Sequence, residues 1–272
     1  MKVAFLFLFL LFLLSAKAQH TFKKIWETDS VLAVPESVLP DLKNGILYVS
    51  LIDGAADAKD GKGGVAILDK DGKIMNAAWV TGLNAPKGMS IYSNKLYVAD
   101  LDNVVEIDIK TGKIVQRYPV QGAVFLNDIT INNNGVVYVS DTRTGNVHQL
   151  KDGQVTSYLT GLTGVNGLRA VNKDLYILTS KEMLKADEKK TLTKIADLDY
   201  PGDGIEPIGN GDFVVSAWTG YIHYVMADGK KQLLLNTTEQ KKNTADIGFD
   251  PSRRIVYVPT FLAKSVMAYQ LQ

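Results

Sequence analysis

The feature that most constrains this chain is a short strand pattern, built of apolar residues around one aromatic side chain, that returns six times. The copies lie at residues 46–49, 95–98, 136–139, 174–177, 211–214 and 255–258. The clearest copy belongs to residues 124–142, where Asn133, Asn134 and Gly135 separate two apolar runs and so predict a hairpin. A spacing of roughly 40 residues is typical of propeller blades, each a four-stranded antiparallel sheet.

Each copy carries the other strands that a blade needs. First strands are expected at residues 36–41, 88–92, 128–131, 167–170, 204–208 and 246–249, and third strands at 64–69, 104–108, 146–150, 183–186, 221–226 and 265–269. Turn pairs such as Asp71-Gly72 and Asp228-Gly229 lead into fourth strands. No stretch of ten or more residues shows helical periodicity. The sequence therefore predicts an all-β, six-bladed β-propeller.

The last copy reaches Gln272 after only three strands, whereas residues 21–27 precede the first copy without a blade of their own. We expect this N-terminal strand to complete the last blade, because closure by both termini leaves few open sheet edges. Residues 54–63 form the longest expected loop.

The first 18 residues have the composition of a targeting segment. Lys2, a short apolar run and an Ala-x-Ala site ending at Ala18 predict a cleaved signal peptide, and hence an exported, periplasmic or secreted protein. Residues 19–272 are then expected to form one domain. The chain has no cysteine and a net charge of +1, which gives no indication of disulfides, thiol chemistry or a nucleic-acid partner.

Polar residues stand where the first strands begin. In a propeller these positions face one mouth of the central channel, and here they are Glu36, Lys87, Asn127 with Asp128, Asn166, Asp203 and Asp246. Carboxylate and amide oxygens without cysteine or histidine suit a hard cation, and calcium tolerates irregular geometry better than magnesium does. The same residues could instead be solvated by channel water, with Lys87 as an internal counterion.

Four segments resemble the gluconolactonase, senescence-marker-protein and luciferin-regenerating-enzyme family of six-bladed propellers. They are Pro35-Glu36-Ser37, Phe125-Leu126-Asn127-Asp128, Val165-Asn166-Gly167-Leu168 and Gly202-Asp203-Gly204-Ile205. The resemblance implies metal ligands at Glu36, Asn127, Asn166 and Asp203, with Asp203 also the general base and Asn127 facing the substrate. Phe125 stands where the family has a substrate-binding arginine, which indicates a more apolar ligand.

The first functional hypothesis is an exported calcium-dependent hydrolase of lactones or related esters, with Asp203 and Asn127 as catalytic residues. Phe125, Asp128, Trp218 and Phe261 are the candidate substrate-binding residues. A serine triad is disfavoured because it needs a histidine, and His148 and His223 fall in predicted third strands.

The alternative is a non-catalytic exported propeller that binds a small molecule or a partner protein. Several copies, such as Pro86-Lys87-Gly88-Met89, look equally like the NHL class of propellers, which are often binding scaffolds. Neither hypothesis involves nucleic acid, or a membrane once the signal peptide is removed. The sequence gives no oligomeric state.

Overall fold

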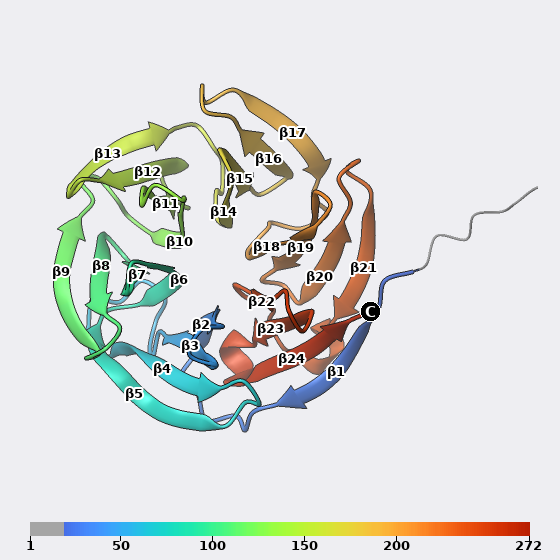
Figure 1. Cartoon of the computed structure of the whole chain (residues 1–272), viewed down its shortest axis with the longest axis horizontal. Coiled ribbons are helices and arrows are strands. Elements are labelled where there is room, and N and C mark those ends of the chain that lie inside the picture. The colour runs from blue at the N-terminus through green and yellow to red at the C-terminus, as the bar shows by residue number, and fades with distance from the viewer. Residues whose placement is uncertain (1–18) are drawn as a thin grey trace, which may run out of the picture.

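In the computed structural model, residues 19–272 form six four-stranded antiparallel sheets around a central channel (Figure 1). The prediction of an all-β, six-bladed propeller is confirmed. The predicted signal peptide, residues 1–18, lies outside the described residues. No helix within residues 19–272 has the length and apolar character that crossing a membrane requires.

The sheets are numbered as blades 1 to 6, and their strands run from axis to rim. Blades 1 to 3 consist of β2 (Pro35–Asp41), β3 (Ile46–Leu51), β4 (Gly63–Asp69) and β5 (Ile74–Leu83); β6 (Pro86–Tyr92), β7 (Lys95–Asp100), β8 (Asn103–Asp108) and β9 (Lys113–Pro119); and β10 (Leu126–Ile131), β11 (Val137–Asp141), β12 (Asn146–Lys151) and β13 (Gln154–Leu159). Blades 4 to 6 consist of β14 (Leu168–Val171), β15 (Asp174–Leu178), β16 (Glu182–Ala186) and β17 (Leu192–Asp197); β18 (Ile205–Gly209), β19 (Asp212–Ala217), β20 (Tyr221–Val225) and β21 (Lys231–Asn236); and β22 (Gly248–Asp250), β23 (Ile255–Pro259), β24 (Val266–Leu271) and β1 (Phe22–Glu27).

The second strands are almost wholly apolar because both of their faces are buried. In β3, Leu47 and Val49 pack in a cluster shared with blade 6, whereas Tyr48 between them packs against Leu96 and Val98 of blade 2. Side chains alternate along a strand, so each blade seals two neighbours at once. The repeated strand pattern is therefore the core of the ring, and the aromatic residue fills the space between blades.

The ring is closed at its rim and again at its axis. At the rim, β1 pairs antiparallel with β24, as the sequence predicted, and Thr21 and Gln272 exchange backbone hydrogen bonds there, so the blue strand β1 lies beside the C-terminal end of the chain (Figure 1). At the axis, Ser37 and Asp246 form a parallel bridge between blades 1 and 6, and the Ser37 hydroxyl donates to Asp246 Oδ2 at 2.5 Å. This inner bridge was not anticipated.

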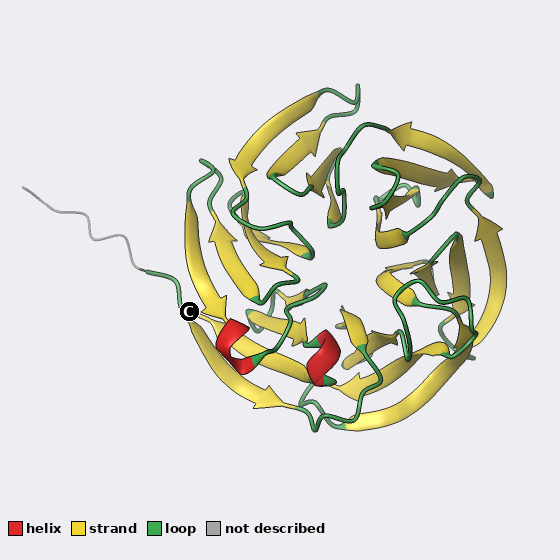
Figure 2. Ribbon diagram, turned by 180° about the vertical axis from the view of Figure 1, so that it is seen from behind, coloured by secondary structure: helices red, strands yellow, loops and turns green. Residues whose placement is uncertain are grey.

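The loops that follow the second strands lie on one face of the ring, together with the starts of the first strands, because neighbouring strands are antiparallel. The 3₁₀ helices η1 (Thr238–Gln240) and η2 (Phe261–Ala263) lie on the face turned toward the viewer in Figure 2. We call this face the mouth, and residues 52–62, which join β3 to β4, the mouth loop.

Candidate functional site

The polar residues at the mouth sit in β-bulges of the innermost segments. In blades 1, 2 and 3 the ladder between the first and second strands shifts register at the predicted positions, leaving Glu36, Lys87 and Asn127 outside regular pairing. Blades 4 and 5 have the same two-against-one arrangement. Leu178 pairs with both Asn166 and Gly167, and Ser216 pairs with both Asp203 and Gly204. A bulge re-aims a side chain that would otherwise follow the pleat. We call these five residues the bulge ring.

Buried serines fix three of the bulges. The amides of Ser37, Asp128 and Gly204 each donate to a serine hydroxyl of the neighbouring second strand, at 2.8–2.9 Å. The three acceptors are Ser50, Ser140 and Ser216, all fully buried. Glu36, Asn127 and Asp203 directly precede these anchored residues, so the local hydrogen bonds hold their backbone in equivalent places on three alternate blades.

The glycines that follow Asn166 and Asp203 allow close packing between blades and do not form turns. Neither Gly167 nor Gly204 has a positive φ. A Cβ at Gly167 would lie 2.1 Å from the Asp203 carbonyl oxygen, and one at Gly204 would lie 2.4 Å from the Ile247 amide nitrogen. Asn166-Gly167 and Asp203-Gly204 could pass for ordinary turn pairs in the sequence. In the structure they allow adjacent blades to approach each other at the axis.

The structure brings Asn166 and Asp203 into direct contact. Asn166 Nδ2 donates to Asp203 Oδ1 at 2.9 Å. Two buried oxygens of the ring accept no hydrogen bond within the described chain, Asn166 Oδ1 and Glu36 Oε2. Asn127 Nδ2 donates to the Thr142 hydroxyl at 3.1 Å, which holds the amide in place. Buried oxygens of this kind normally have a partner, and each unpaired one is costly.

Burial and neighbouring negative charges raise the pKa values of the acids in the bulge ring. Burial raises the pKa of Glu36 well above its usual value, and the charges of Asp203 and Asp246 raise it further against the opposing effect of Lys87. Burial raises the pKa of Asp203 to about 8, again helped by Asp246, although the Asn166 hydrogen bond lowers it. The bare site therefore disfavours the charged carboxylates, a condition that a cation among them would relieve.

These residues fit a hard cation held by mixed ligands. Within residues 19–272 no three Asp, Glu or His side chains lie close enough together to hold a metal by themselves. The cation would need Glu36 and Asp203 for charge and the amides of Asn127 and Asn166 as neutral ligands. Calcium accepts amide oxygens and water besides carboxylates, so the donor set is compatible with it.

Lys87 is held at the edge of this site by the mouth loop. Its Nζ donates to the carbonyl oxygens of Ala56, at 3.0 Å, and Ala85, at 2.9 Å, and lies 4.2 Å from the centre of the Phe125 ring. Arg143 also lies against that ring, at 4.5 Å, and its Nη2 pairs with Asp57 of the mouth loop at 2.8 Å. Phe125 is thus part of the wall that covers Lys87.

The other two predicted aromatic residues belong to blades 5 and 6, and Phe261 packs against the same buried cluster as Phe125, formed by Ile52, Ala85 and Leu101. Trp218 follows β19 and Phe261 follows β23, and their rings meet edge to face with centroids 5.5 Å apart. Trp218 remains 42% exposed. Its carbonyl accepts a hydrogen bond from Asn243 Nδ2 at 3.0 Å, which ties it to the segment leading into blade 6.

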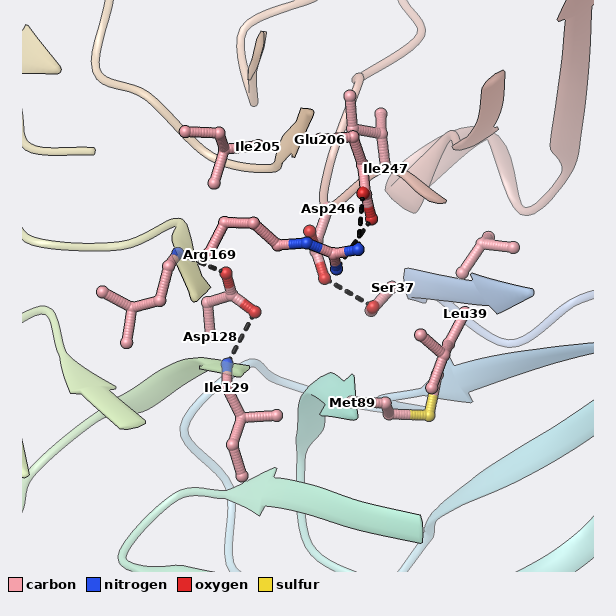
Figure 3. Close-up of a pocket in the computed structure, with 12 residues that line it drawn as sticks. Ser37, Leu39, Met89, Asp128, Ile129, Arg169, Ile205, Glu206, Asp246 and Ile247 are labelled. Carbon is pink, nitrogen blue, oxygen red and sulfur yellow. Dashed lines mark hydrogen bonds and ion pairs between the residues drawn. The ribbon is translucent and has the colours of Figure 1, made fainter. Parts of the chain in front are cut away.

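Asp128 lies one residue deeper, and both of its oxygens are used by the fold. Oδ1 accepts from the Ile129 amide and Oδ2 from the Leu168 amide, each at 2.6 Å, so the carboxylate links blades 3 and 4. Figure 3 shows it with Ser37 and Asp246 around the channel. The contact of Asp128 with substrate stays a prediction. Its two hydrogen bonds to backbone amides give its carboxylate a structural role.

Below the bulge ring lies a cavity of about 20 Å³, the inner chamber, with space for about one water molecule. Arg169 pairs there with Glu206 through two contacts, Nη1–Oε1 at 3.2 Å and Nη2–Oε2 at 3.0 Å (Figure 3). Burial raises the pKa of Glu206 to about 7 although Arg169 lowers it.

The sequence did not predict that Ser37, Arg169 and Glu206 line the channel. A signal was available, since Arg169 and Glu206 each stand three residues after a ring residue, Asn166 and Asp203, in adjacent blades. Aligning the repeats would have shown opposite charges at one position. The sequence predicted that Asp246 holds the same position in blade 6 as the bulge-ring residues hold in the other blades. In the structure Ala245 holds that position, because its amide donates to the Pro259 carbonyl. Asp246 lies one residue deeper, where it pairs with Ser37.

Comparison with solved structures supports the fold. The chain resembles a catalytically inactive histidine-to-alanine variant of virginiamycin B lyase from Staphylococcus aureus with quinupristin (TM-score 0.67, 13% identity), and selenomethionine-substituted virginiamycin B lyase from the same organism (TM-score 0.64, 12% identity). Each alignment covers 93% of this chain and 100% of the other. No family model and no curated protein sequence matches.

Proposed function

We propose that this protein is an exported, calcium-dependent hydrolase of lactones or related esters, with its site at the mouth of the channel. The observation that carries the proposal is the pair of buried oxygens without partners, Glu36 Oε2 and Asn166 Oδ1, beside the carboxylate of Asp203. These oxygens need a partner from outside the chain, and the neighbouring carboxylate of Asp203 favours a cation in that place.

Glu36, Asn127, Asn166 and Asp203 would hold the cation. When bound, calcium would polarise the ester carbonyl and stabilise the negative charge that develops on its oxygen. Asp203 Oδ1 is held by Asn166, whereas Oδ2 accepts no hydrogen bond within residues 19–272. Asp203 would take a proton from water as the water oxygen adds to the carbonyl carbon. The ring C–O bond then breaks, and the proton passes to the leaving alkoxide.

The histidines of the chain take no part in this scheme. His148 lies in β12 and His223 in β20, both third strands, as the sequence predicted. His20 stacks on Tyr224 near the rim, with ring centroids 3.8 Å apart. The solved neighbours are lyases, and one of them is inactive after a histidine was replaced. The mouth of this chain offers carboxylates instead, which favours hydrolysis assisted by a carboxylate.

Two measurements test the proposal. Calcium at about 100 times its Kd should stabilise the folded protein by roughly 2.7 kcal/mol, and Glu36→Gln should remove most of that shift. Asp203→Asn should abolish hydrolysis of a panel of lactones and aryl esters while the circular dichroism spectrum is retained. Asp197→Asn, on the exposed end of β17, is the matched control.

The outcomes separate the two functional hypotheses. Stabilisation by calcium without hydrolysis of any panel member would favour the alternative, an exported propeller that binds a small molecule or partner without turnover. Hydrolysis that survives Asp203→Asn would overturn the role of that residue. A protein that neither responds to calcium nor hydrolyses the panel would overturn the proposal itself.

A further inference from the structure

The mouth is asymmetric, and this asymmetry bears on the class of substrate. Three polar contacts fasten the mouth loop over blades 2 and 3: Lys87 to the Ala56 carbonyl, Arg143 to Asp57, and Lys59 to Asp102 at 2.6 Å. The charged groups on this side are therefore engaged with one another. Blade 4 presents Ser180 and Lys181 after its second strand.

The side of the mouth over blades 5 and 6 carries two aromatic residues, Trp218 and Phe261, and Phe261 also packs against the buried cluster of Ile52, Ala85 and Leu101. The Ser216 carbonyl accepts the Asp203 amide at 2.8 Å, and Trp218 follows two residues later, in the turn beyond β19, so it lies farther out on the mouth face than Asp203. Phe261 stands two residues beyond Pro259, whose carbonyl accepts the Ala245 amide. Both side chains thus border the same opening as Asp203.

Trp218 is held in place, yet it is open to solvent. Its carbonyl is fixed by Asn243 and its ring by Phe261, but 42% of the residue stays exposed. Leu262, the next residue of η2, is 63% exposed. Three such side chains cannot supply the roughly 800 Å² that each partner buries in a stable protein interface. The surface has the size of a small apolar group.

We propose that Trp218 and Phe261 form the subsite for an apolar substituent of the substrate, so that the preferred substrates are lactones carrying an alkyl or aryl group. This inference rests on the proposed function, since it assumes that the reacting ester lies over the bulge ring. The substituent leaves the ester over blades 5 and 6 because the mouth loop covers blades 2 and 3. Burial of each methylene against the aromatic surface favours binding by about 0.8 kcal/mol, or about fourfold.

The test uses γ-butyrolactone, γ-hexalactone, γ-octalactone and γ-decalactone with calcium present. For the wild type, kcat/KM should rise by about fourfold per methylene over the first part of the series. Trp218→Ala should flatten this dependence, and Trp218→Phe should retain part of it. Leu233→Ala is the control, because Leu233 is 49% exposed but lies in the rim strand β21.

Wild-type rates that do not depend on chain length, or an unchanged dependence in Trp218→Ala, would overturn the subsite. Failure of the hydrolase proposal is recognised separately, because no lactone would then be hydrolysed. Calorimetric titration with the same lactones decides that case. Affinity that rises with chain length and is lost in Trp218→Ala supports the subsite without turnover, and affinity independent of chain length refutes it.

Discussion

Replacement of Glu27 by glutamine tests how the closing strand is fixed. Glu27 ends β1, and its carboxylate accepts from three donors: Lys24 Nζ at 2.5 Å, Lys242 Nζ at 2.5 Å and the Ser265 hydroxyl at 2.7 Å. Lys242 precedes the first strand of blade 6, β22, and Ser265 directly precedes β24. One side chain therefore links the N-terminal strand to two other segments of the last blade.

The magnitude follows from the exposure of these partners. The side chains of Lys24 and Lys242 are 45% and 23% exposed, so each ion pair contributes about 0.2–1 kcal/mol. Ser265 is fully buried, and its hydrogen bond weakens by about 1 kcal/mol when the acceptor loses its charge. Glu27→Gln should thus lower the free energy of unfolding by about 1.5–3 kcal/mol at neutral pH. For a domain of this size, that lowers Tm by about 3–12 °C.

The effect should depend on pH in a defined direction. Burial raises the pKa of Glu27, but the hydrogen bonds from Lys24, Lys242 and Ser265 outweigh it and lower the pKa from 4.5 to about 2. The stabilisation is therefore complete above pH 4.5 and is lost as the pH falls from 4.5 toward 2. The difference in Tm between wild type and Glu27→Gln should shrink over that interval.

Thermal unfolding followed by circular dichroism, at several pH values and at low and high salt, measures this difference. Glu188→Gln is the control. The side chains of Glu188 and its partner Lys173 are 63% and 76% exposed, so their ion pair should contribute almost nothing to stability. An equal loss of Tm at neutral and acidic pH would show that the substitution acts through packing. No loss at neutral pH would refute the view that Glu27 fastens the closing strand.

Three further predictions concern the mouth and the axis. Gly204→Ala places a Cβ 2.4 Å from the Ile247 amide nitrogen and should destabilise the fold by about 1–3 kcal/mol or more in urea unfolding. Lys87→Met removes the positive charge that acts on Glu36, so less calcium should suffice for the half-maximal Tm shift; an unchanged or higher requirement would refute this. Arg143→Met should speed proteolytic cleavage of the mouth loop with little change in Tm, because the lost ion pair is half-exposed.

The fold could be predicted because the repeated apolar pattern marks the strands that are buried on both faces. Tyr48 and Tyr257 are each 1% exposed, and each lies between neighbours that pack toward a different blade. Such a strand needs apolar residues at every position, a composition that a half-exposed strand would not have. The incomplete sixth copy then required a strand from elsewhere, and residues 21–27 were available.

The layers of the site could not be predicted to the same depth. Asn127 and Asp128 are adjacent in sequence, yet a bulge sends Asn127 to the mouth and turns Asp128 into a link between blades. Sequence periodicity cannot resolve a bulge, because it breaks the alternation on which that reading depends. Arg169 was missed for another reason, since a charged residue in an inner strand becomes meaningful only when Glu206 of the next blade is seen beside it.

The acids around the axis divide according to their hydrogen-bond partners, and that division separates the proposed cation ligand Glu36 from the acids that hold the fold together. Asp128 accepts two backbone amides, Asp246 accepts the Ser37 hydroxyl, and Glu206 accepts Arg169. Each has protein donors that offset the cost of its burial. Glu36, by contrast, keeps an oxygen with no partner within residues 19–272. The deeper acids are thus satisfied within the fold, whereas Glu36 and the Asn166 oxygen at the mouth need a partner from outside the chain. The response to calcium is the decisive measurement, because the proposed cation would bind these oxygens and so stabilise the folded protein.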